Sequence, residues 1–324
     1  MKVLLFSDLH LSDRAPSSCT DSYGDDLLDL LGETVAVAEQ YQVDAVVWAG
    51  DIFHSKVPAR NSHRLVQKVL GIGKAYQRPW HIVPGNHDLQ HDVLDSVWET
   101  QPLGVLFRAG AKPLIGRSRE FPQLYGVPWQ QTWDNATVTR ALDDYRSGGN
   151  NTGEFPLVVT HAPLYPPGLE LPYENFPADL WAKAMIGMSL PAGCFYGHVH
   201  EYHGVWDCGG VRFCNNGALS RGSLHEHNLT RRVLVTIWDS RDCSFTEVPL
   251  LKVKPADQVF RLREKQVVTD SVGKLDEFLS SIGSAKFSVL SVEAVIAHVR
   301  ALGVGKDVEA KIAELLDLAS HVSL

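Results

Sequence analysis

The chain has 324 residues, of which 44% are hydrophobic, and its formal net charge is −8. This length is enough for one large domain, or for one large and one small domain. No run of residues approaches the roughly 20 apolar positions of a membrane span, so no membrane partner is expected. The short apolar run Val3–Phe6 is followed by no cleavage site of small residues, which argues against a signal peptide.

The five cysteines are odd in number, scattered along the chain, and never spaced as Cys-x-x-Cys; they are Cys19, Cys194, Cys208, Cys214 and Cys243. This pattern favours free thiols in a reducing cytoplasm over a disulfide framework or a zinc knuckle.

Positive charge is concentrated in one segment, although the net charge by itself argues weakly against a nucleic-acid partner. Residues 52–87 contain no Asp or Glu. Four basic residues recur there every four positions, at Lys56, Arg60, Arg64 and Lys68. They share one helix face if a helix starts near Pro58, and such a face can contact DNA phosphates. The alternative interpretation is an ordinary solvated helix face.

The first third of the chain alternates buried strands with amphipathic helices. Apolar runs predict strands over Lys2–Ser7, Ala45–Ala49 and Trp80–Val83, and helical spacing predicts helices over 27–38 and around 65–70. Pro84-Gly85 ends the third strand. A β-α-β-α-β opening of this kind indicates a parallel or mixed sheet with right-handed crossovers.

The middle of the chain has fewer helices. We expect strands over 124–127 and 157–160, a helix over 136–146 and a Pro-rich loop over 163–177. Four further strands, over 194–196, 211–214, 233–238 and 244–250, have no long helices between them and suggest a second, more antiparallel sheet. The predicted fold is α/β, a four-layer αββα sandwich of two mixed sheets flanked by helices. Apolar spacing within 275–316 adds a small C-terminal helical appendage.

Five short polar motifs follow predicted strands, where ligands bind in open α/β sheets. They are Asp8-Leu9-His10, Gly50-Asp51, Gly85-Asn86-His87-Asp88, Thr160-His161 and Gly197-His198-Val199-His200. Residues i and i+2 of an extended segment point to the same side, so the paired motifs can each present two donors to one place. Carboxylate, imidazole and amide oxygen together suit Mn, Fe or Zn.

Two divalent ions at such a site would bring four positive charges, of which Asp8 and Asp51 neutralise two. The remaining field is positive and favours a hydroxide and a phosphate oxygen. Two metals about 3.5–4 Å apart can clamp the attacking and leaving oxygens of an in-line displacement.

These motifs, in this order, resemble the calcineurin-like metallophosphoesterase superfamily over residues 1–250. The resemblance implies one metal held by Asp8, His10, Asp51 and His200. It implies a second metal held by Asp51, as a bridge, with Asn86, His161 and His198. By the same resemblance, His87 protonates the leaving oxygen or stabilises the transition state, and Asp88 orients His87.

A narrower resemblance concerns Gly50-Asp51-Ile52-Phe53-His54, followed by Lys56-Val57-Pro58. This segment is similar to that of SbcD-type DNA repair nucleases, which implies a manganese-dependent exonuclease and endonuclease subunit. It also implies a homodimer working with an SbcC-type coiled-coil ATPase, and a His54 that contacts the scissile phosphate. A solvated loop histidine is the alternative for His54.

The motifs and the charge pattern are compatible with three functions. The first is DNA hydrolysis, the second hydrolysis of a small phosphodiester or phosphomonoester such as a cyclic nucleotide, and the third a binding module without chemistry. All expected ligand positions are filled, which ranks the third last. The catalytic domain is expected over 1–253, and residues 254–324 are expected to form a reduced cap or a partner-binding hairpin. His203, His225 and His227 are expected at the surface or rim, and His81 in the core.

Overall fold

The computed structural model of the protein describes residues 1–147, 155–169, 176–185 and 192–262. The chain divides into two compact units, of which the first comprises Met1–Phe260. The apolar stripes expected at 275–316 lie outside the described residues, so the helical appendage stays a prediction. Within the described ranges, no helix is long and apolar enough to cross a membrane.

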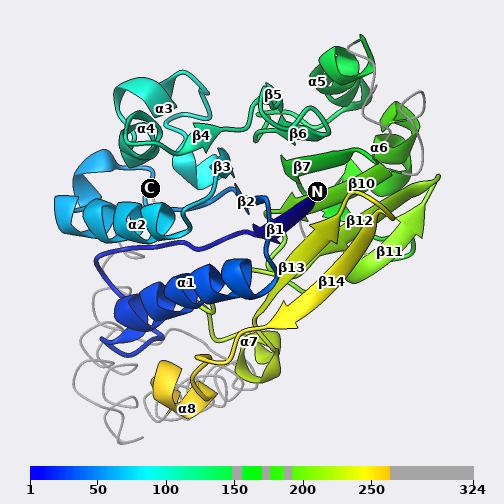
Figure 1. Ribbon diagram of the computed structural model, residues 1–324. Helices are drawn as coiled ribbons and strands as arrows, with labels where there is room; N and C mark the ends of the chain where they lie inside the picture. The colour runs from blue at the N-terminus through cyan, green and yellow to red at the C-terminus, as the bar shows by residue number, and fades with distance from the viewer. Residues whose placement is uncertain (148–154, 170–175, 186–191, 263–324) are drawn as a thin grey trace, which may run out of the picture. The chain divides into compact units, whose positions relative to one another are not determined.

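The first sheet has six strands (Figure 1). In spatial order they are β14 (Ser244–Pro249), β13 (Leu234–Asp239), β1 (Lys2–Phe6), β2 (Ala45–Ala49), β3 (Trp80–Val83) and β4 (Lys112–Pro113). Strands β1 to β4 run parallel, as the β-α-β-α-β opening predicted, whereas β13 pairs antiparallel with both β1 and β14. The sheet is therefore mixed.

The second sheet also has six strands. In spatial order they are β11 (Gly204–Cys208), β12 (Val211–Asn215), β10 (Ala192–Gly197), β7 (Leu157–His161), β6 (Leu124–Val127) and β5 (Gly116–Arg117). Its four central strands run parallel, and only the two edge strands are antiparallel to their neighbours.

The four strands after residue 190 were expected in one more antiparallel sheet, and this prediction was wrong. β10 and β12 belong to the second sheet, but β13 and β14 belong to the first. Asn216, which follows β12, donates from Nδ2 to the carbonyl oxygens of Leu5 and Leu234 at 3.4 and 3.0 Å. This buried side chain ties the connection to the first sheet, where β13 then pairs with β1.

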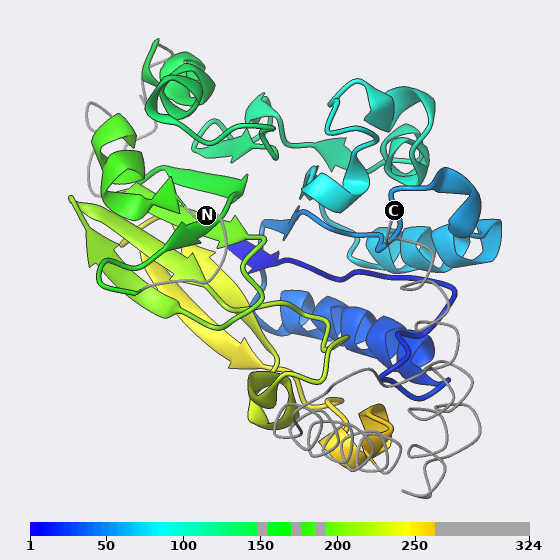
Figure 2. The same ribbon diagram turned by 180° about the vertical axis from the view of Figure 1, so that it is seen from behind.

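Helices cover the outer faces of the two sheets, which gives the predicted four-layer αββα arrangement (Figures 1 and 2). α1 (Tyr23–Gln40) and α2 (His63–Ala75) lie on the first sheet, and α5 (Asn135–Ser147) and α6 (Ala178–Met185) on the second. Apolar side chains of both sheets pack between them, among them Val47 and Val159, each 0% exposed. Burying this apolar area is the main force that holds the layers together.

Short elements complete the described fold. They are the 3₁₀ turns η1 (Pro58–Arg60) and η2 (Asn86–Asp88), the helices α3 (Ser96–Glu99), α4 (Pro102–Arg108), α7 (Glu226–Thr230) and α8 (Ala256–Val259), and the paired strands β8 (Leu164–Tyr165) and β9 (Phe176–Pro177). All five cysteines are free, as the sequence predicted.

The first unit extends past the boundary expected at residue 253 and ends at Phe260. Several contacts hold the additional residues on the catalytic fold. Arg221 Nη2 donates to the carbonyl oxygen of Lys254, and the backbone N–H of Thr20 donates to the carbonyl oxygen of Val259 at 2.9 Å.

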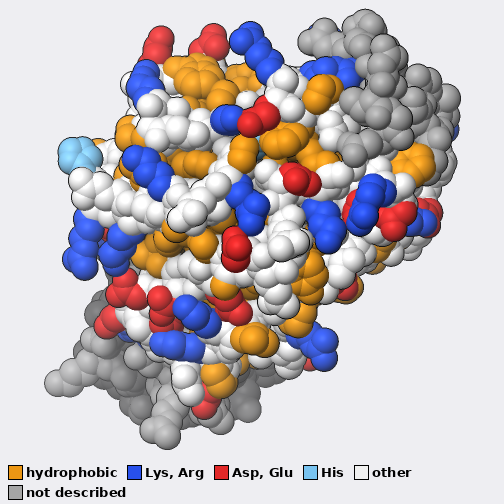
Figure 3. All heavy atoms as spheres, viewed as in Figure 1, with side chains coloured by type: hydrophobic (Ala, Val, Ile, Leu, Met, Phe, Trp, Pro, Cys, Tyr) orange, Lys and Arg blue, Asp and Glu red, His pale blue; other side chains and the backbone are white. Residues whose placement is uncertain are grey.

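The four basic residues from Lys56 to Lys68 do not share one helix face, so this prediction was wrong. Ser62 caps α2 by accepting the N–H of Leu65, and Asn61 is extended, so the helix begins only at His63. Lys56 pairs with Asp92 at 3.0 Å, and Lys68 with Asp25 at 2.8 Å. Arg60 and Arg64 are exposed and make no ion pair within the described ranges. On the face seen in Figure 3, Lys and Arg side chains lie among Asp and Glu side chains.

Candidate metal centre

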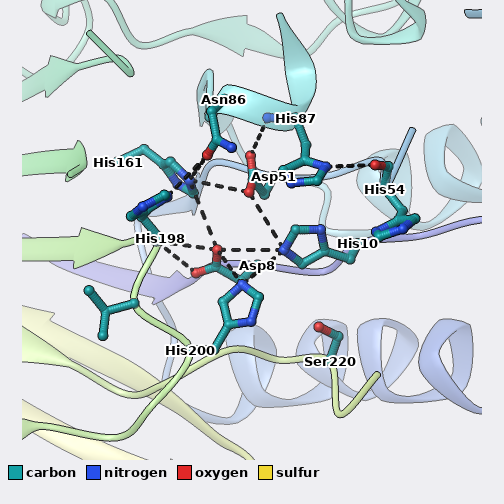
Figure 4. A network of polar contacts seen from close by, with 12 residues as sticks. Asp8, His10, Asp51, His54, Asn86, His87, His161, His198, His200 and Ser220 are labelled. Carbon is teal, nitrogen blue, oxygen red and sulfur yellow. Dashed lines mark hydrogen bonds and ion pairs between the residues drawn. The ribbon is translucent and has the colours of Figure 1, made fainter. Parts of the chain in front are cut away.

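The polar motifs come together because the strands that precede them end at one place between the two sheets (Figure 4). Strands β1, β2 and β3 of the first sheet and β7 and β10 of the second supply them. The seven side chains expected to bind metal all lie there; they are Asp8, His10, Asp51, Asn86, His161, His198 and His200. Residues separated by up to 192 positions therefore share one site.

A first group of donor atoms surrounds Asp8. Its Oδ1 lies 3.6 Å from His200 Nε2 and 3.9 Å from His10 Nε2, and the two imidazole nitrogens are 3.0 Å apart. Asp51 Oδ2 approaches the same group at 3.5 Å from His10 Nε2.

A second group of donors surrounds Asn86. Its Oδ1 lies 3.1 Å from both His161 Nε2 and His198 Nδ1. Asp51 Oδ2 lies 3.4 Å from His161 Nε2. One carboxylate oxygen of Asp51 is therefore next to both groups, as a bridging ligand must be.

The backbone of the candidate ligands is strained. Asp8, His10, Asp51 and His198 have φ of 57°, 46°, 53° and 82°, in the left-handed region that residues with side chains rarely adopt. Such conformations cost on the order of 1–3 kcal/mol each and persist only where the surrounding structure holds them. Here the N–H of Asp8 donates to Gly50, and that of His10 to Asp51. Four of the nine non-glycine residues with positive φ in the described part of the chain are candidate ligands, and strain of this kind is typical of a functional site.

Glycine allows the strands to approach closely enough for this geometry. A Cβ at Gly50 would lie 2.1 Å from His161 Nδ1, and one at Gly85 would lie 2.3 Å from Asp51 Oδ1. Both distances are far below van der Waals contact, so a side chain at either position would displace a candidate ligand.

Hydrogen bonds orient the donors toward the centre. His161 Nδ1 donates to the carbonyl oxygen of Ala49 at 2.8 Å, which leaves Nε2 to face the two carboxylates. The backbone N–H of His87 donates to Asp51 Oδ1 at 2.8 Å, which leaves Oδ2 between the two groups. Partners of this kind fix the tautomer and direction of metal ligands.

Charge interactions shift the ionisation of these buried groups in the ion-free protein. Burial opposes ionisation of Asp8, but the hydrogen bond and charges of His200 and His161 outweigh it and lower the pKa of Asp8. Burial also favours the neutral form of His161, but Asp51 and Asp8 raise the pKa of His161 to about 9. Burial lowers the pKa of His10 to about 3. In the ion-free protein, imidazoles thus partly neutralise the negative charge of the two carboxylates. A bound cation would neutralise the same charge.

The donor set fits a pair of transition-metal ions. Four imidazoles, two carboxylates and one amide oxygen converge, and His10 and His200 meet nitrogen to nitrogen. Nitrogen-rich sets of this kind suit Mn, Fe or Zn and are unsuited to Ca.

Comparison with known proteins decides the family. The sequence profile named calcineurin-like phosphoesterase matches residues 1–202, more than half of the chain. The chain belongs to this family. As a calcineurin-like phosphoesterase, it is a metal-dependent phosphoesterase, a hydrolase whose metal-site candidates are the His and Asp groups described above.

Two curated relatives of this calcineurin-like phosphoesterase are DNA repair proteins. The DNA double-strand break repair protein Mre11 of Saccharolobus solfataricus is 26% identical over 62% of the chain and 49% of its own length. The double-strand break repair protein MRE11 of Encephalitozoon cuniculi is 23% identical over 90% of the chain and 55% of its own length. The chain thus spans about half the length of these relatives.

The fold is shared with a solved structure, a dimetal phosphatase from Danio rerio. The two have a TM-score of 0.53 and 15% sequence identity, over 78% of the chain and 97% of the phosphatase. The match supports the fold class predicted from the sequence.

His87 and His54 lie together beside the first donor group. His87 Nδ1 is 2.6 Å from the carbonyl oxygen of His54, and the two rings are stacked with centroids 5.5 Å apart. Ring nitrogens of His10, His54 and His87 lie within 4.8 Å of one another. Both expected catalytic histidines of this phosphoesterase are therefore at the site.

Asp88, which was expected to orient His87, makes its described hydrogen bonds to the backbone, so its effect on His87 stays a prediction. Its carboxylate accepts backbone N–H groups, from Ile52 at 3.0 Å and from Gly85 at 3.0 Å. Asp88 thereby joins the loop after β2 to the loop after β3. The partner of His87 Nδ1 is the carbonyl oxygen of His54.

A pocket of about 440 Å³ opens above the centre. Residues outside the motifs complete its walls; they are Trp129, Gln131, Trp133, Pro163, Glu201, Ser223, His225 and His227. His225 and His227 were expected at the surface or rim, and they line this pocket. The sequence analysis did not identify the two tryptophans. Trp129 follows the end of β6 by two residues, and this strand-end position is the signal that could have indicated it. His81 is 2% exposed, as predicted for a core histidine.

Proposed function

We propose that this chain is a two-metal phosphodiesterase that acts on DNA, as the exonuclease and endonuclease subunit of an SbcCD-type repair complex. The observation that carries the two-metal part is the position of Asp51 Oδ2, 3.5 Å from His10 Nε2 and 3.4 Å from His161 Nε2. One metal would be held by Asp8, His10, Asp51 and His200, and the other by Asp51, Asn86, His161 and His198. A bound pair of cations supplies Lewis-acid chemistry, which activates water and polarises the phosphate.

The residues of the chain have separate tasks in this proposal. Asp51 would hold both cations through Oδ2, since its Oδ1 accepts the backbone N–H of His87. His87 projects into the pocket, where it donates a proton to the leaving oxygen or stabilises charge on the phosphate. His54 fixes the ring of His87 through its carbonyl oxygen, and its own ring is placed to contact the scissile phosphate.

Two observations support DNA as the substrate. Both curated relatives are named as double-strand break repair proteins. The segment from Gly50 to His54, which resembles SbcD-type nucleases, lies at the site, because Asp51 and His54 both belong to it. Exposed Arg60 and Arg64, together with Lys56 and Lys68, stay predicted DNA contacts through phosphate, although they form no single stripe.

The proposed function also includes a working metal, an oligomeric state, a partner and a cellular location. We propose manganese as the working metal, with Fe or Zn as the alternatives that the same ligands accept. We also propose a homodimer, an SbcC-type coiled-coil ATPase as partner, and a cytoplasmic location consistent with five free cysteines.

The test is an assay of the purified protein with manganese, alone and with the ATPase. Linear duplex DNA, circular single-stranded DNA and a cyclic nucleotide are compared at equal concentration. The proposal predicts hydrolysis of DNA that chelation by EDTA abolishes. Cleavage of the cyclic nucleotide with every DNA form left intact would overturn it, and would point to a small-molecule phosphodiesterase instead.

A further inference from the structure

One wall of the pocket is aromatic and carries no charge. Trp129 and Trp133 follow β6 and line the pocket with Gln131 and Pro163. The ring of Trp129 lies against the candidate ligand His198, with centroids 4.7 Å apart and planes tilted by 36°. The wall therefore begins directly at the second donor group.

Packing holds the two rings in place. Trp133 contacts Trp129 edge to face at 5.9 Å, and its other neighbour is Trp181, at 5.8 Å, which is fully buried. The backbone N–H of Trp129 donates to the carbonyl oxygen of Pro84 at 3.0 Å. Rings fixed in this way lose little conformational entropy when a ligand stacks on them.

The rings present carbon surface to the pocket. Both indole Nε1 atoms are buried and have no hydrogen-bond acceptor among the residues that the structure describes. Because the side chains are only partly buried, their exposed part is the ring carbons. The other lining residues outside the motifs include Glu201, Ser223, His225 and His227, which are polar. The pocket thus combines an aromatic contact surface with polar groups.

We propose that Trp129 and Trp133 form a stacking site for the nucleobase next to the scissile phosphate, and that the substrate strand is unpaired at that nucleotide. This inference rests on the proposed function, because it takes the phosphodiester of a nucleic acid as the group above the metal centre. An uncharged aromatic wall does not attract phosphate, but every base has a flat face that stacks on it.

The position of Trp129 bears on the pairing of the substrate. Its ring contacts His198, so a base stacked on it belongs to a nucleotide that adjoins the phosphate at the centre. Inside a duplex, both faces of that base are covered by its neighbours, so it cannot stack on a side chain. A single strand or a frayed end exposes the face. The site would accept any base, because stacking uses the flat face of the base and not its hydrogen-bonding groups.

The experiment uses single-stranded oligonucleotides that differ by one abasic nucleotide, placed in turn on either side of the mapped cleavage point. With manganese and the wild-type protein, removing the base on one side should raise KM roughly tenfold, as loss of one stacked base does. Removing the base on the other side should change KM little. Trp129→Ala should raise KM roughly tenfold for the intact strand and abolish the difference between intact and abasic strands. Trp129→Phe, which keeps an aromatic face, should retain most of that difference.

Two controls separate stacking from damage to the metal centre. Trp98→Ala removes a tryptophan that packs on Phe107 outside the pocket, and it should leave KM for both strands unchanged. Manganese binding by titration calorimetry should be the same in Trp129→Ala and wild type. Removal of Trp129 could disturb His198 and so weaken manganese binding. In that case Trp133→Ala is compared on the intact and abasic strands, because Trp133 touches no candidate ligand in the described contacts.

The outcomes distinguish this inference from the proposed function. If the wild-type protein cleaves no DNA, the proposed function fails. If it cleaves DNA but both tryptophan variants keep the wild-type preference for the intact strand, DNA hydrolysis stands and the stacking site is overturned. If the wild-type protein cleaves every abasic strand as well as the intact strand, the stacking site is overturned too.

Discussion

His87 Nδ1 donates its hydrogen to the carbonyl oxygen of His54 over 2.6 Å. A carbonyl oxygen can only accept, so this contact fixes the proton on Nδ1 and leaves Nε2 as the atom that can exchange a proton. His87 lines the pocket and its ring is not bonded to a carboxylate in the described contacts. In the proposed function, His87 is therefore placed to act on the leaving group.

Replacing His87 with Ala should lower kcat for DNA by about 100- to 10,000-fold, the range for loss of general acid catalysis. The loss should be much smaller for bis(p-nitrophenyl) phosphate, because its leaving group needs no proton. Initial rates on both substrates, with manganese counted by titration calorimetry, check this. His63→Ala, at an exposed position outside the pocket, is the matched control. Loss of bound manganese in His87→Ala would show that His87 is a ligand.

Asp51→Asn should weaken both metals together, since one carboxylate oxygen faces both donor groups. The substitution removes a negative charge and keeps the shape of the side chain, so the fold should survive. Titration calorimetry with manganese should show both affinities reduced by more than tenfold, a change of about 1.4 kcal/mol or more. Asp92→Asn removes a carboxylate that pairs with Lys56 and should bind manganese like the wild-type protein. Two unchanged sites in Asp51→Asn would argue against a bridge.

Asp88→Asn should destabilise the protein without changing the pH dependence of the reaction. Asp88 Oδ1 accepts the N–H groups of Ile52 and Phe53, and Oδ2 accepts that of Gly85, whereas an asparagine keeps an acceptor at only one of the two positions. Leaving a buried N–H without an acceptor costs about 1–3 kcal/mol. Urea unfolding of the ion-free protein should show that loss, and the pH profile of kcat should keep its midpoint. A shifted midpoint would mean that Asp88 acts on His87 after all.

Metal binding should release protons and weaken as the pH falls. Burial alone would lower the pKa of His161, but Asp51 and Asp8 raise it to about 9, so the ion-free ring is charged at pH 7. Its Nδ1 is bonded to Ala49, so a cation must displace the proton from Nε2. The affinity for manganese should therefore increase up to about tenfold per pH unit between pH 6.5 and 8. Calorimetry in buffers of different ionisation enthalpy measures the released protons, and binding independent of pH would contradict the assignment.

The sequence by itself determined most of the elements and the composition of the site. Strands β2, β3 and β6 occur at the residues predicted, because each is a buried apolar run between clear turn signals. The candidate ligands could be predicted because they follow such strands, and the carboxyl ends of parallel strands meet at one edge. Local pattern and spacing are sufficient for both.

Only the tertiary structure decided which strands share a sheet and which side chains face one another. β13 pairs with β1, and Asn216 donates to the carbonyl oxygens of Leu5 and Leu234. The contact with Leu5 spans 211 positions, and no local pattern contains it. Asp88 accepts backbone N–H groups from two loops. Ser62 caps α2, so the helix begins after Lys56 and Arg60 and the four basic residues do not share it. Local periodicity reports which face of an element is apolar. The partner of a buried hydrogen-bonding group depends on what the fold brings near it.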